Sequence, residues 1–252
     1  MNAVLPEGFF DALEARHLAE LTFTEVRKGL QALSSLYVER RDRISRGAAL
    51  DGAGKRAAFA LYYGPQHLLS VREIARRLEL KLAQPLVVDL GCGTLAAAAG
   101  LALAAREAGQ PAEVLGVEKN GWAAGEARFT MTALGLRGRI LRQDIESFVL
   151  PERVGAVVAA YTINELSEPT RLRWRGRLLA AADAGACVLV VEPLSRKSSP
   201  WWPEWKAAVL ERGGREDEWR LAWSPPERMR LLAKAAGLIP RELLARSLCF
   251  GS

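Results

Sequence analysis

Hydrophobic residues follow two different patterns along the chain, and the change falls near residue 85. Before that point apolar residues recur at helical spacing, as Val26 and Leu30 do after a capping-box pattern at Thr22–Glu25. Gly64–Pro65 is expected to interrupt this region, because proline disfavours a helical conformation in the residue before it. The spacing therefore predicts helices over residues 22–43, 55–63 and 65–80.

From residue 85 onward, short apolar runs alternate with helical patterns, which is typical of a parallel sheet with crossover helices. The seven predicted strands lie at residues 86–90, 113–117, 139–142, 156–161, 186–191, 217–223 and 243–250. The last two flank a late helix, so we expect them to form an antiparallel pair at one edge. The chain is therefore predicted to contain an N-terminal helical region (1–84) and an α/β domain (85–252). We expect the domain to be a doubly wound, seven-stranded, Rossmann-like sheet, mostly parallel with an antiparallel edge strand.

Composition and charge narrow the class of protein. Hydrophobic residues make up 50% of the chain and charged residues 25%, as in a folded domain. No run approaches the roughly 18 apolar residues of a membrane helix, and the amino terminus lacks the features of a leader. We therefore expect a cytoplasmic protein without a membrane partner. The net charge of +6 favours an anionic partner.

The densest basic cluster contains Arg40, Arg41, Arg43 and Arg46. It is either the solvated end of a helix or a contact to a phosphate backbone. The three cysteines and two histidines lie far apart in the sequence, which predicts neither a disulfide framework nor a metal site.

The segment Pro85–Ala98, PLVVDLGCGTLAAA, combines an apolar strand, a glycine turn and the start of an alanine-rich helix. Gly91 and Gly93 lack Cβ atoms, so the backbone can bend tightly there and a ligand can approach it. In open α/β sheets, ligands bind outside the carboxyl ends of the strands, next to such turns. This segment is therefore the centre of the candidate site.

Three carboxylates, Asp89, Glu118 and Asp144, fall at the ends of the first three predicted strands. Glu118 follows the glycine turn at about the spacing, roughly 20 residues, at which a carboxylate binds ribose hydroxyls. Asp144 can meet an adenine amine. The series Gly91–Ala96 comes close to a dinucleotide fingerprint, so NAD remains possible. Asp89, however, suits an ammonium group better than a pyrophosphate, which favours S-adenosylmethionine (SAM) as the cofactor.

Three motifs, VVDLGCGT, GVEKN and RQDI, occur in this order and resemble those of class I SAM-dependent methyltransferases from Leu86 to the carboxyl end. The resemblance implies a methyltransferase and a set of cofactor contacts. Its site comprises Asp89, Gly91 and Gly93 beside the methionine part, Glu118 at the ribose, Asp144 with Ile145 at the adenine, and the neighbouring Cys92, Lys119 and Tyr161. Cys92 is expected to be a small residue that fits the turn, not a nucleophile.

A narrower resemblance rests on RAAFALYYGP (56–65), AYTINEL (160–166) and VVEP (190–193). These segments are similar to a methyltransferase-like family that associates with the small ribosomal subunit in mitochondria and has bacterial relatives. The resemblance implies RNA or the small ribosomal subunit as a partner. The mitochondrial members carry cysteines after the fifth strand that hold an iron–sulfur cluster. Here only Cys249 follows Cys187, so no cluster is implied.

Catalytic candidates follow the fourth predicted strand. Asn164 is expected to orient an amine or hydroxyl and Glu165 to act as a base, although both residues also suit the capping of the next helix. Trp201, Trp202 and Trp205 either pack a helix on the sheet or stack on a base. Tyr62 and Tyr63 likewise belong either to the core or to a segment that closes over the cofactor.

The sequence leaves three functions open. The first is a methyltransferase acting on RNA, expected to be small-subunit ribosomal RNA, with the helical region binding the substrate. The second is a methyltransferase acting on a small molecule or protein, with the helical region as a lid. The third is an assembly factor that binds the cofactor and has little activity, because the amino-group methylation motif N/D-P-P-Y is absent.

Overall fold

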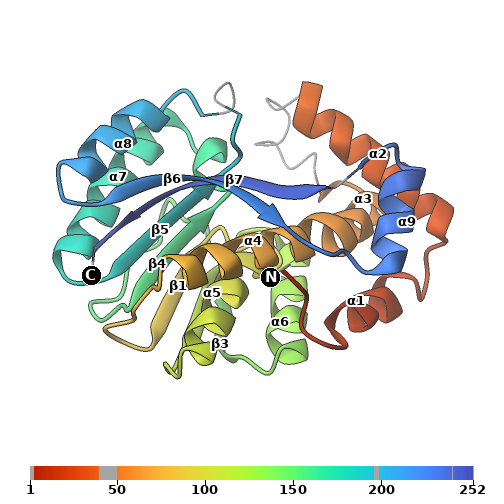
Figure 1. Cartoon of the computed structure of the whole chain (residues 1–252), viewed down its shortest axis with the longest axis horizontal. Coiled ribbons are helices and arrows are strands. Elements are labelled where there is room, and N and C mark those ends of the chain that lie inside the picture. Colours follow the sequence, from red (N-terminus) through yellow and green to blue (C-terminus); the bar gives the residue numbers. More distant parts are fainter. Residues whose placement is uncertain (1–2, 40–49, 196–198, 240, 252) are drawn as a thin grey trace. The chain divides into compact units, whose positions relative to one another are not determined.

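The computed structural model describes residues 3–39, 50–195, 199–239 and 241–251. The basic cluster Arg40–Arg46 and the expected helix end near Arg43 lie outside these residues. The chain forms two compact units, one of Met1–Leu69 with Leu221–Leu243 and the other of Ser70–Arg220 with Leu244–Ser252 (Figure 1). The boundary expected at Gln84–Pro85 falls within the second of these units.

A seven-stranded sheet dominates the second unit, with strand order β3-β2-β1-β4-β5-β7-β6. The strands are β1 Leu86–Leu90, β2 Glu113–Val117, β3 Arg137–Leu141, β4 Ala156–Ala160, β5 Cys187–Glu192, β6 Arg215–Ala222 and β7 Glu242–Phe250. The first five pair in parallel, whereas β7 runs antiparallel to β5. The predicted α/β class, with a mostly parallel sheet and an antiparallel strand toward one edge, is therefore confirmed.

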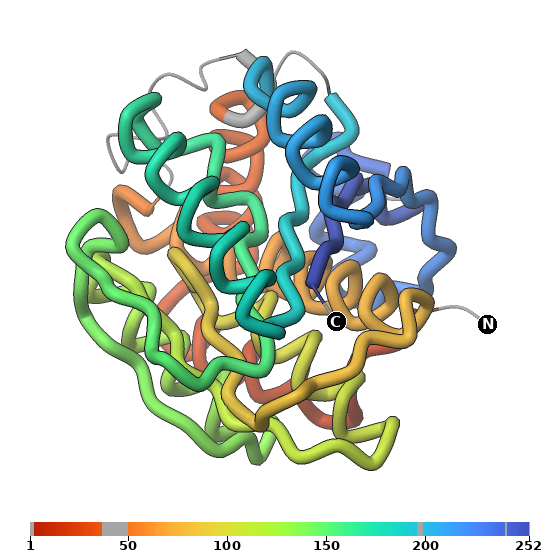
Figure 2. The backbone as a smooth tube through the Cα atoms, turned by 90° about the vertical axis from the view of Figure 1, so that its left-hand side faces the viewer, coloured from red at the N-terminus to blue at the C-terminus, as the bar shows by residue number. Residues whose placement is uncertain are grey.

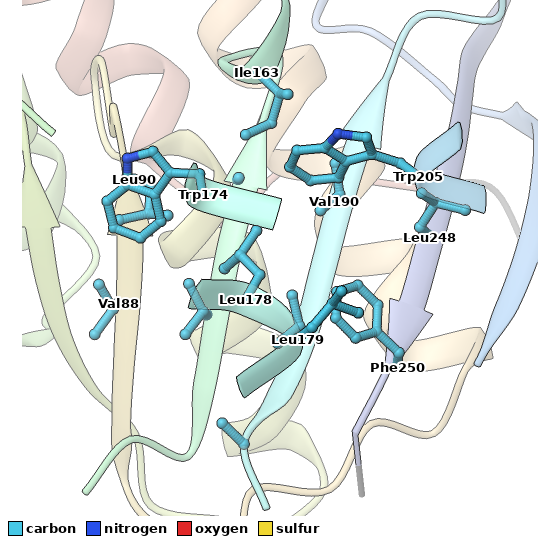
Figure 3. Packing of buried hydrophobic residues seen from close by; sticks show 14 of the residues in the cluster. Val88, Leu90, Ile163, Trp174, Leu178, Leu179, Val190, Trp205, Leu248 and Phe250 are labelled. Carbon is cyan, nitrogen blue, oxygen red and sulfur yellow. The ribbon is translucent and has the colours of Figure 1, made fainter. Parts of the chain in front are cut away.

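Two helices of the second unit, α7 (Glu168–Asp183) and α8 (Trp202–Leu210), pack on one face of this sheet. They lie side by side in Figure 2, and Arg175 of α7 forms an ion pair with Glu204 of α8. Figure 3 shows Trp174 and Trp205 among the apolar side chains of β1, β5 and β7. Successive residues of these strands point to opposite faces of the sheet, and most of the residues on both faces are apolar. The face covered by α7 and α8 is therefore apolar along its length.

The described helices α5 (Ala96–Glu107) and α6 (Gly121–Ala133) follow β1 and β2 and contact the sheet as crossover helices. Ten consecutive residues of α5, Ala96 to Ala105, are buried. Seven of these are alanine, and their small side chains let the helix lie close to the strands beneath it. The alanine-rich run predicted to be a helix is thus buried on all sides.

The first unit contains the helices α1 (Phe9–His17), α2 (Phe23–Glu39), α3 (Ala53–Ala58) and α9 (Glu227–Ala235). The capping box at the start of α2 is present. The amide of Thr22 donates to Oε2 of Glu25 at 2.8 Å, and the amide of Glu25 donates to Oγ1 of Thr22 at 3.3 Å. This reciprocal pair satisfies two amides that the helix itself leaves open.

The expected break at Gly64–Pro65 is wrong. The chain continues from α3 through a π-helical turn, η3 (Phe59–Tyr63), directly into α4 (Gly64–Arg77). Gly64 keeps helical angles, φ −52° and ψ −54°, and its amide donates to the carbonyl of Phe59. A wider turn relieves the clash between a proline ring and the preceding carbonyls, and Pro65 has no amide to leave unsatisfied. Within this turn Tyr62 is buried, as a core residue would be.

Candidate functional site

The glycine turn lies where β1 ends, at the carboxyl edge of the sheet. Gly91 and Gly93 have φ angles of +64° and +51°, in the left-handed region that favours glycine. A Cβ atom on Gly91 would lie 2.5 Å from Cγ2 of Thr162, whereas a Cβ atom on Gly93 would meet nothing within 4 Å. The turn is therefore packed against the β4 side at Gly91 and open at Gly93.

Asp89 is buried, with 1% of its surface exposed. Its Oδ2 atom accepts a hydrogen bond from the backbone amide of Ala98, 2.9 Å away, in the first turn of α5. No other described residue donates a hydrogen bond to this carboxylate. Burial raises the pKa of Asp89 to about 7, and the nearby charge of Glu118 acts in the same direction. The carboxylate therefore lies below the amino terminus of α5, and its Oδ1 atom accepts no hydrogen bond from a described residue.

Glu118 follows β2 and reaches across to the glycine turn. Its Oε2 atom accepts from the amide of Gly93 at 3.0 Å, and its Oε1 atom accepts from the amide of Asn120 at 2.7 Å. Each carboxylate oxygen carries two lone pairs, so both can accept a further hydrogen bond. Two backbone amides from different loops therefore fix the orientation of this side chain.

Asp144 lies after β3 and is held by two neighbours. Its Oδ1 atom accepts from the amide of Glu146 at 3.0 Å, and Nζ of Lys119 lies 3.4 Å from its Oδ2 atom. The Lys119–Asp144 pair is solvent-exposed, so it contributes little to stability. Ile145 is buried in the core beneath α7. The structure therefore places Asp144 and Lys119 on the surface, whereas Ile145, the next residue along the chain, is buried.

Cys92 is buried within the glycine turn, and its amide donates to the carbonyl of Val117 at 3.0 Å. Burial raises the pKa of its thiol well above the ordinary value, with further contributions from Asp89 and Glu118. A thiol in such surroundings stays protonated at neutral pH. This agrees with the interpretation of Cys92 as a small residue that fits the turn.

The segment Tyr161–Leu166, called here the β4 loop, begins with a left-handed residue. Tyr161 has φ +59°, and its side chain hydrogen-bonds to Ser70. Burial raises the pKa of the Tyr161 hydroxyl above its ordinary value. Next to it, the Thr162 hydroxyl lies 3.1 Å from the carbonyl oxygen of Ala160 and 3.3 Å from that of Gly91. The loop is therefore anchored on the glycine turn.

Asn164 and Glu165 differ in what they offer to a substrate. The amide group of Asn164 already has partners: Nδ2 donates to Oε2 of Glu192, and Oδ1 accepts from Nε1 of Trp201 at 2.9 Å. The Glu165 side chain is exposed, but the surrounding protein and the charge of Glu118 raise its pKa to about 7, while Lys119 opposes this shift. A carboxyl group that titrates near neutral pH suits a proton acceptor.

The structure thus brings together Asp89, the glycine turn, Glu118 and Glu165, with Asp144 and Lys119 beside Glu118. The sequence did not predict that Thr162 and Glu192 belong to the site, nor that Trp201 forms a hydrogen bond with Asn164. Glu192 had one signal, since it is a charged residue that ends a strand of apolar residues. Its partner Asn164 is 28 residues away along the chain, a distance from which no local pattern predicts contact.

Among the described residues, no group of three or more histidine, cysteine, aspartate or glutamate side chains could hold a metal ion. In the same residues, no helix has the length and apolar character needed to cross a membrane. The three tryptophans that follow β5 are all buried: Trp201, Trp202 and Trp205. They pack α8 on the sheet, so the base-stacking alternative finds no exposed ring at these positions.

No family model and no curated protein matches the chain. Several solved structures do, among them a SAM-dependent O-methyltransferase from Thermotoga maritima (21% identity, 72% of this chain and 64% of the other, TM-score 0.46). A putative RNA methyltransferase from Pyrococcus horikoshii matches at 16% identity over 76% of this chain and 87% of its own, with a TM-score of 0.47. A putative class I SAM-dependent methyltransferase from Listeria monocytogenes matches at 11% identity over 91% of this chain and 88% of its own, with a TM-score of 0.48.

Proposed function

We propose that this protein is a class I methyltransferase that uses SAM. The observation that carries the proposal is the position of Asp89 below the amino terminus of α5. In dinucleotide-binding folds, the amides of this helix terminus face a pyrophosphate. Here a buried carboxylate already accepts the amide of Ala98, and its negative charge opposes a second anion at this place. A ligand with an ammonium group and no phosphate fits the same place.

The other residues of the site match the remaining parts of SAM. The open side of Gly93 leaves room for the ligand against the backbone. Glu118 is oriented by two amides and retains lone pairs for the two ribose hydroxyls. Asp144, beside Lys119 and next to Ile145 in the chain, is assigned to the adenine end. We expect these residues to bind the cofactor while they keep these hydrogen bonds.

SAM supplies a methyl group on a sulfonium for an in-line displacement, so the protein's task is to place the acceptor and to take its proton. Glu165 is the residue we assign to the proton, because its carboxyl group lies near Glu118 and titrates near neutral pH. Asn164 is assigned to the positioning of the β4 loop, because the nitrogen and the oxygen of its side-chain amide both already form hydrogen bonds.

We propose RNA of the small ribosomal subunit as the acceptor. Support comes from the net charge of +6 and from the three sequence segments that resemble those of the family that associates with this subunit. A second candidate is a small neutral or cationic acceptor. It is favoured by the carboxylates of Asp89, Glu118 and Glu165, which would repel a phosphate backbone that entered the crevice.

Calorimetry with the full chain tests the cofactor. We expect SAM and S-adenosylhomocysteine to bind, NAD not to bind, and Asp89→Ala and Glu118→Ala each to abolish binding while retaining the fold. Binding of NAD, or normal SAM binding by both variants, would contradict the proposed site. Incubation with methyl-labelled SAM then tests the acceptor, using small subunits, free RNA and extracted metabolites in parallel. Label in RNA supports the first candidate, label in metabolites the second, and binding without transfer supports a cofactor-binding assembly factor.

A further inference from the structure

Asn164 connects the β4 loop to two residues that lie outside the proposed cofactor site. Its backbone amide donates to Oε1 of Glu192 at 3.3 Å, its Nδ2 atom donates to Oε2 of the same carboxylate, and its Oδ1 atom accepts from Nε1 of Trp201 at 2.9 Å. All three residues belong to the second unit. They join the end of β4 to the end of β5 and to the start of α8.

The surroundings of this group make its geometry rigid. Glu192 has no exposed surface and Trp201 is 7% exposed. The ring of Trp201 packs on those of Trp202 and Trp205, with centroids 5.5 and 4.8 Å away. A buried carboxylate is costly unless it is hydrogen-bonded and its charge is compensated. Glu192 accepts the hydrogen bonds of Asn164, and Arg246 is its cross-strand partner in the backbone register of β5 and β7.

We propose that Glu192 and Trp201 are positioning residues that hold the β4 loop in place through Asn164. Through this loop they keep Thr162 against Gly91 and Glu165 beside Glu118. The inference rests on the proposed function for its consequence, which is the placement of the proton acceptor. Neither residue touches the cofactor or the acceptor in this role.

The hydrogen-bond directions make the proposal testable by a pair of substitutions. In Glu192→Gln, one of the two carboxylate oxygens becomes an amide donor that faces a donor of Asn164. If the Asn164 amide flips to accept it, its nitrogen then faces the indole N–H of Trp201. One hydrogen bond is therefore lost in every arrangement. In the double variant with Trp201→Phe the second conflict disappears, so the flipped amide restores the bond to Gln at position 192.

The readout is the pKa of Glu165, measured by carbon-13 NMR of the carboxyl groups and assigned by comparison with Glu165→Gln. In the wild-type chain we expect a value near 7, set by the surrounding protein and by Glu118, against the opposing charge of Lys119. Glu192→Gln should lower it toward the ordinary range by about 1 unit or more. Trp201→Phe alone should lower it by less, and the double variant should recover most of the wild-type value.

Trp202→Phe is the matched control, because it removes an indole hydrogen bond in the same tryptophan cluster. Its Nε1 donates to Oε1 of Glu216 at 2.6 Å, whereas the described hydrogen bonds of Asn164 go to Glu192 and Trp201. We expect this variant to lower the melting temperature and to leave the pKa of Glu165 unchanged. A residue that only stabilises the fold would likewise lower the melting temperature and leave this pKa unchanged. The control therefore distinguishes a positioning role from a purely stabilising role.

An unchanged pKa of Glu165 in a folded Glu192→Gln variant would overturn the proposal, as would an ordinary pKa in the wild-type chain. If Glu192→Gln does not fold, Trp201→Phe decides: unchanged values of both the Glu165 pKa and the SAM affinity overturn it. The NMR measurement requires no ligand. A wild-type chain that binds no SAM would therefore contradict the proposed function and leave the result on positioning intact.

Discussion

The Asp89 carboxylate accepts a hydrogen bond from the amide of Ala98 at 2.9 Å, which ties the end of β1 to the first turn of α5. A side-chain amide at position 89 can keep this bond, because its oxygen accepts in the same way. It cannot carry the negative charge that the proposed cofactor's ammonium group requires. The relationship between these two residues therefore separates the structural role of Asp89 from its binding role.

We expect Asp89→Asn to stabilise the ligand-free protein at high pH and to weaken SAM binding at least about tenfold. The pKa of Asp89 is raised from 3.8 to about 7, so the folded state holds this proton more tightly than the unfolded state. The resulting destabilisation develops as the pH rises from about 4 and is complete above about 7. At pH 8, removal of the charge should raise the free energy of unfolding by up to about 4 kcal/mol.

Urea unfolding of both proteins at pH 5 and pH 8 measures this effect. The difference between variant and wild type should be clearly larger at pH 8. Calorimetry at pH 7.5 gives the SAM affinity of the same samples. Equal stabilisation at the two pH values, or wild-type affinity for SAM, would contradict the assignment.

The affinity of the wild-type chain for SAM should itself depend on pH. Asp89 must be ionised to bind an ammonium group, so binding releases the proton that the carboxyl group holds below about pH 7. For a single carboxyl group, the affinity should fall about 25-fold between pH 7.5 and pH 5.5. Calorimetry in buffers of different ionisation enthalpy counts the released protons. An affinity that stays constant over this range would show that Asp89 is not the group that binds the cation.

Sequence reasoning found the elements and the acidic residues at the strand ends because both depend on local patterns. Alternating apolar runs give the strands, and the connections of a doubly wound sheet are short and right-handed, which restricts their order. The carboxylates of Asp89, Glu118 and Asp144 end their strands in the sequence and therefore share one edge of the sheet. Their convergence follows from topology alone.

The features that sequence reasoning missed depend on contacts between distant residues or on backbone detail. A π-helical turn differs from an α-helix by one residue in its hydrogen-bond spacing, so the periodicity before Pro65 does not reveal it. The partners of Asn164 lie 28 and 37 residues further along the chain. Only the structure shows that Glu192 and Trp201 already form hydrogen bonds with the side-chain amide that the sequence predicts to orient a substrate.

Gly91 and Gly93 should respond differently to the same substitution. Gly91→Ala combines a left-handed φ with a Cβ atom 2.5 Å from Cγ2 of Thr162, so we expect a loss of about 2–4 kcal/mol of stability. Gly93→Ala meets no atom within 4 Å and should cost only about 1 kcal/mol. Its added methyl group instead occupies the space proposed for the cofactor, so SAM binding should be lost from a folded protein.

Thr162→Ser provides a control for the first of these variants, because it removes the Cγ2 atom and keeps the hydroxyl. Combined with Gly91→Ala, it should restore part of the lost stability. Thermal unfolding and calorimetry of the wild type and of the four variants (Gly91→Ala, Gly93→Ala, Thr162→Ser and the double variant) test the set. If Gly93→Ala bound SAM as tightly as the wild type, the open side of the turn would not be the binding surface.

His67 makes the stability of the first unit depend on pH in the direction opposite to that expected for Asp89. It lies on α4 beside the rings of Phe59 and Tyr63, with centroid distances of 6.2 Å to each. Burial lowers the pKa of His67 from 6.5 to about 3, so the folded state binds fewer protons than the unfolded state. The stability that neutral His67 provides is therefore present above pH 6.5 and is lost as the pH falls toward 3.

His67→Phe keeps an aromatic ring at this position and removes the titration. At pH 7.5 we expect the two proteins to differ in unfolding free energy by less than about 1 kcal/mol, because neither carries a charge there. At pH 4.5 the variant should gain about 2–3 kcal/mol relative to the wild type, since only the unfolded wild-type chain is fully protonated at His67. Hydrogen exchange of the amides in α2, α3 and η3 assigns the effect to this unit. Parallel pH profiles for the two proteins would mean that His67 is protonated as readily in the folded as in the unfolded chain.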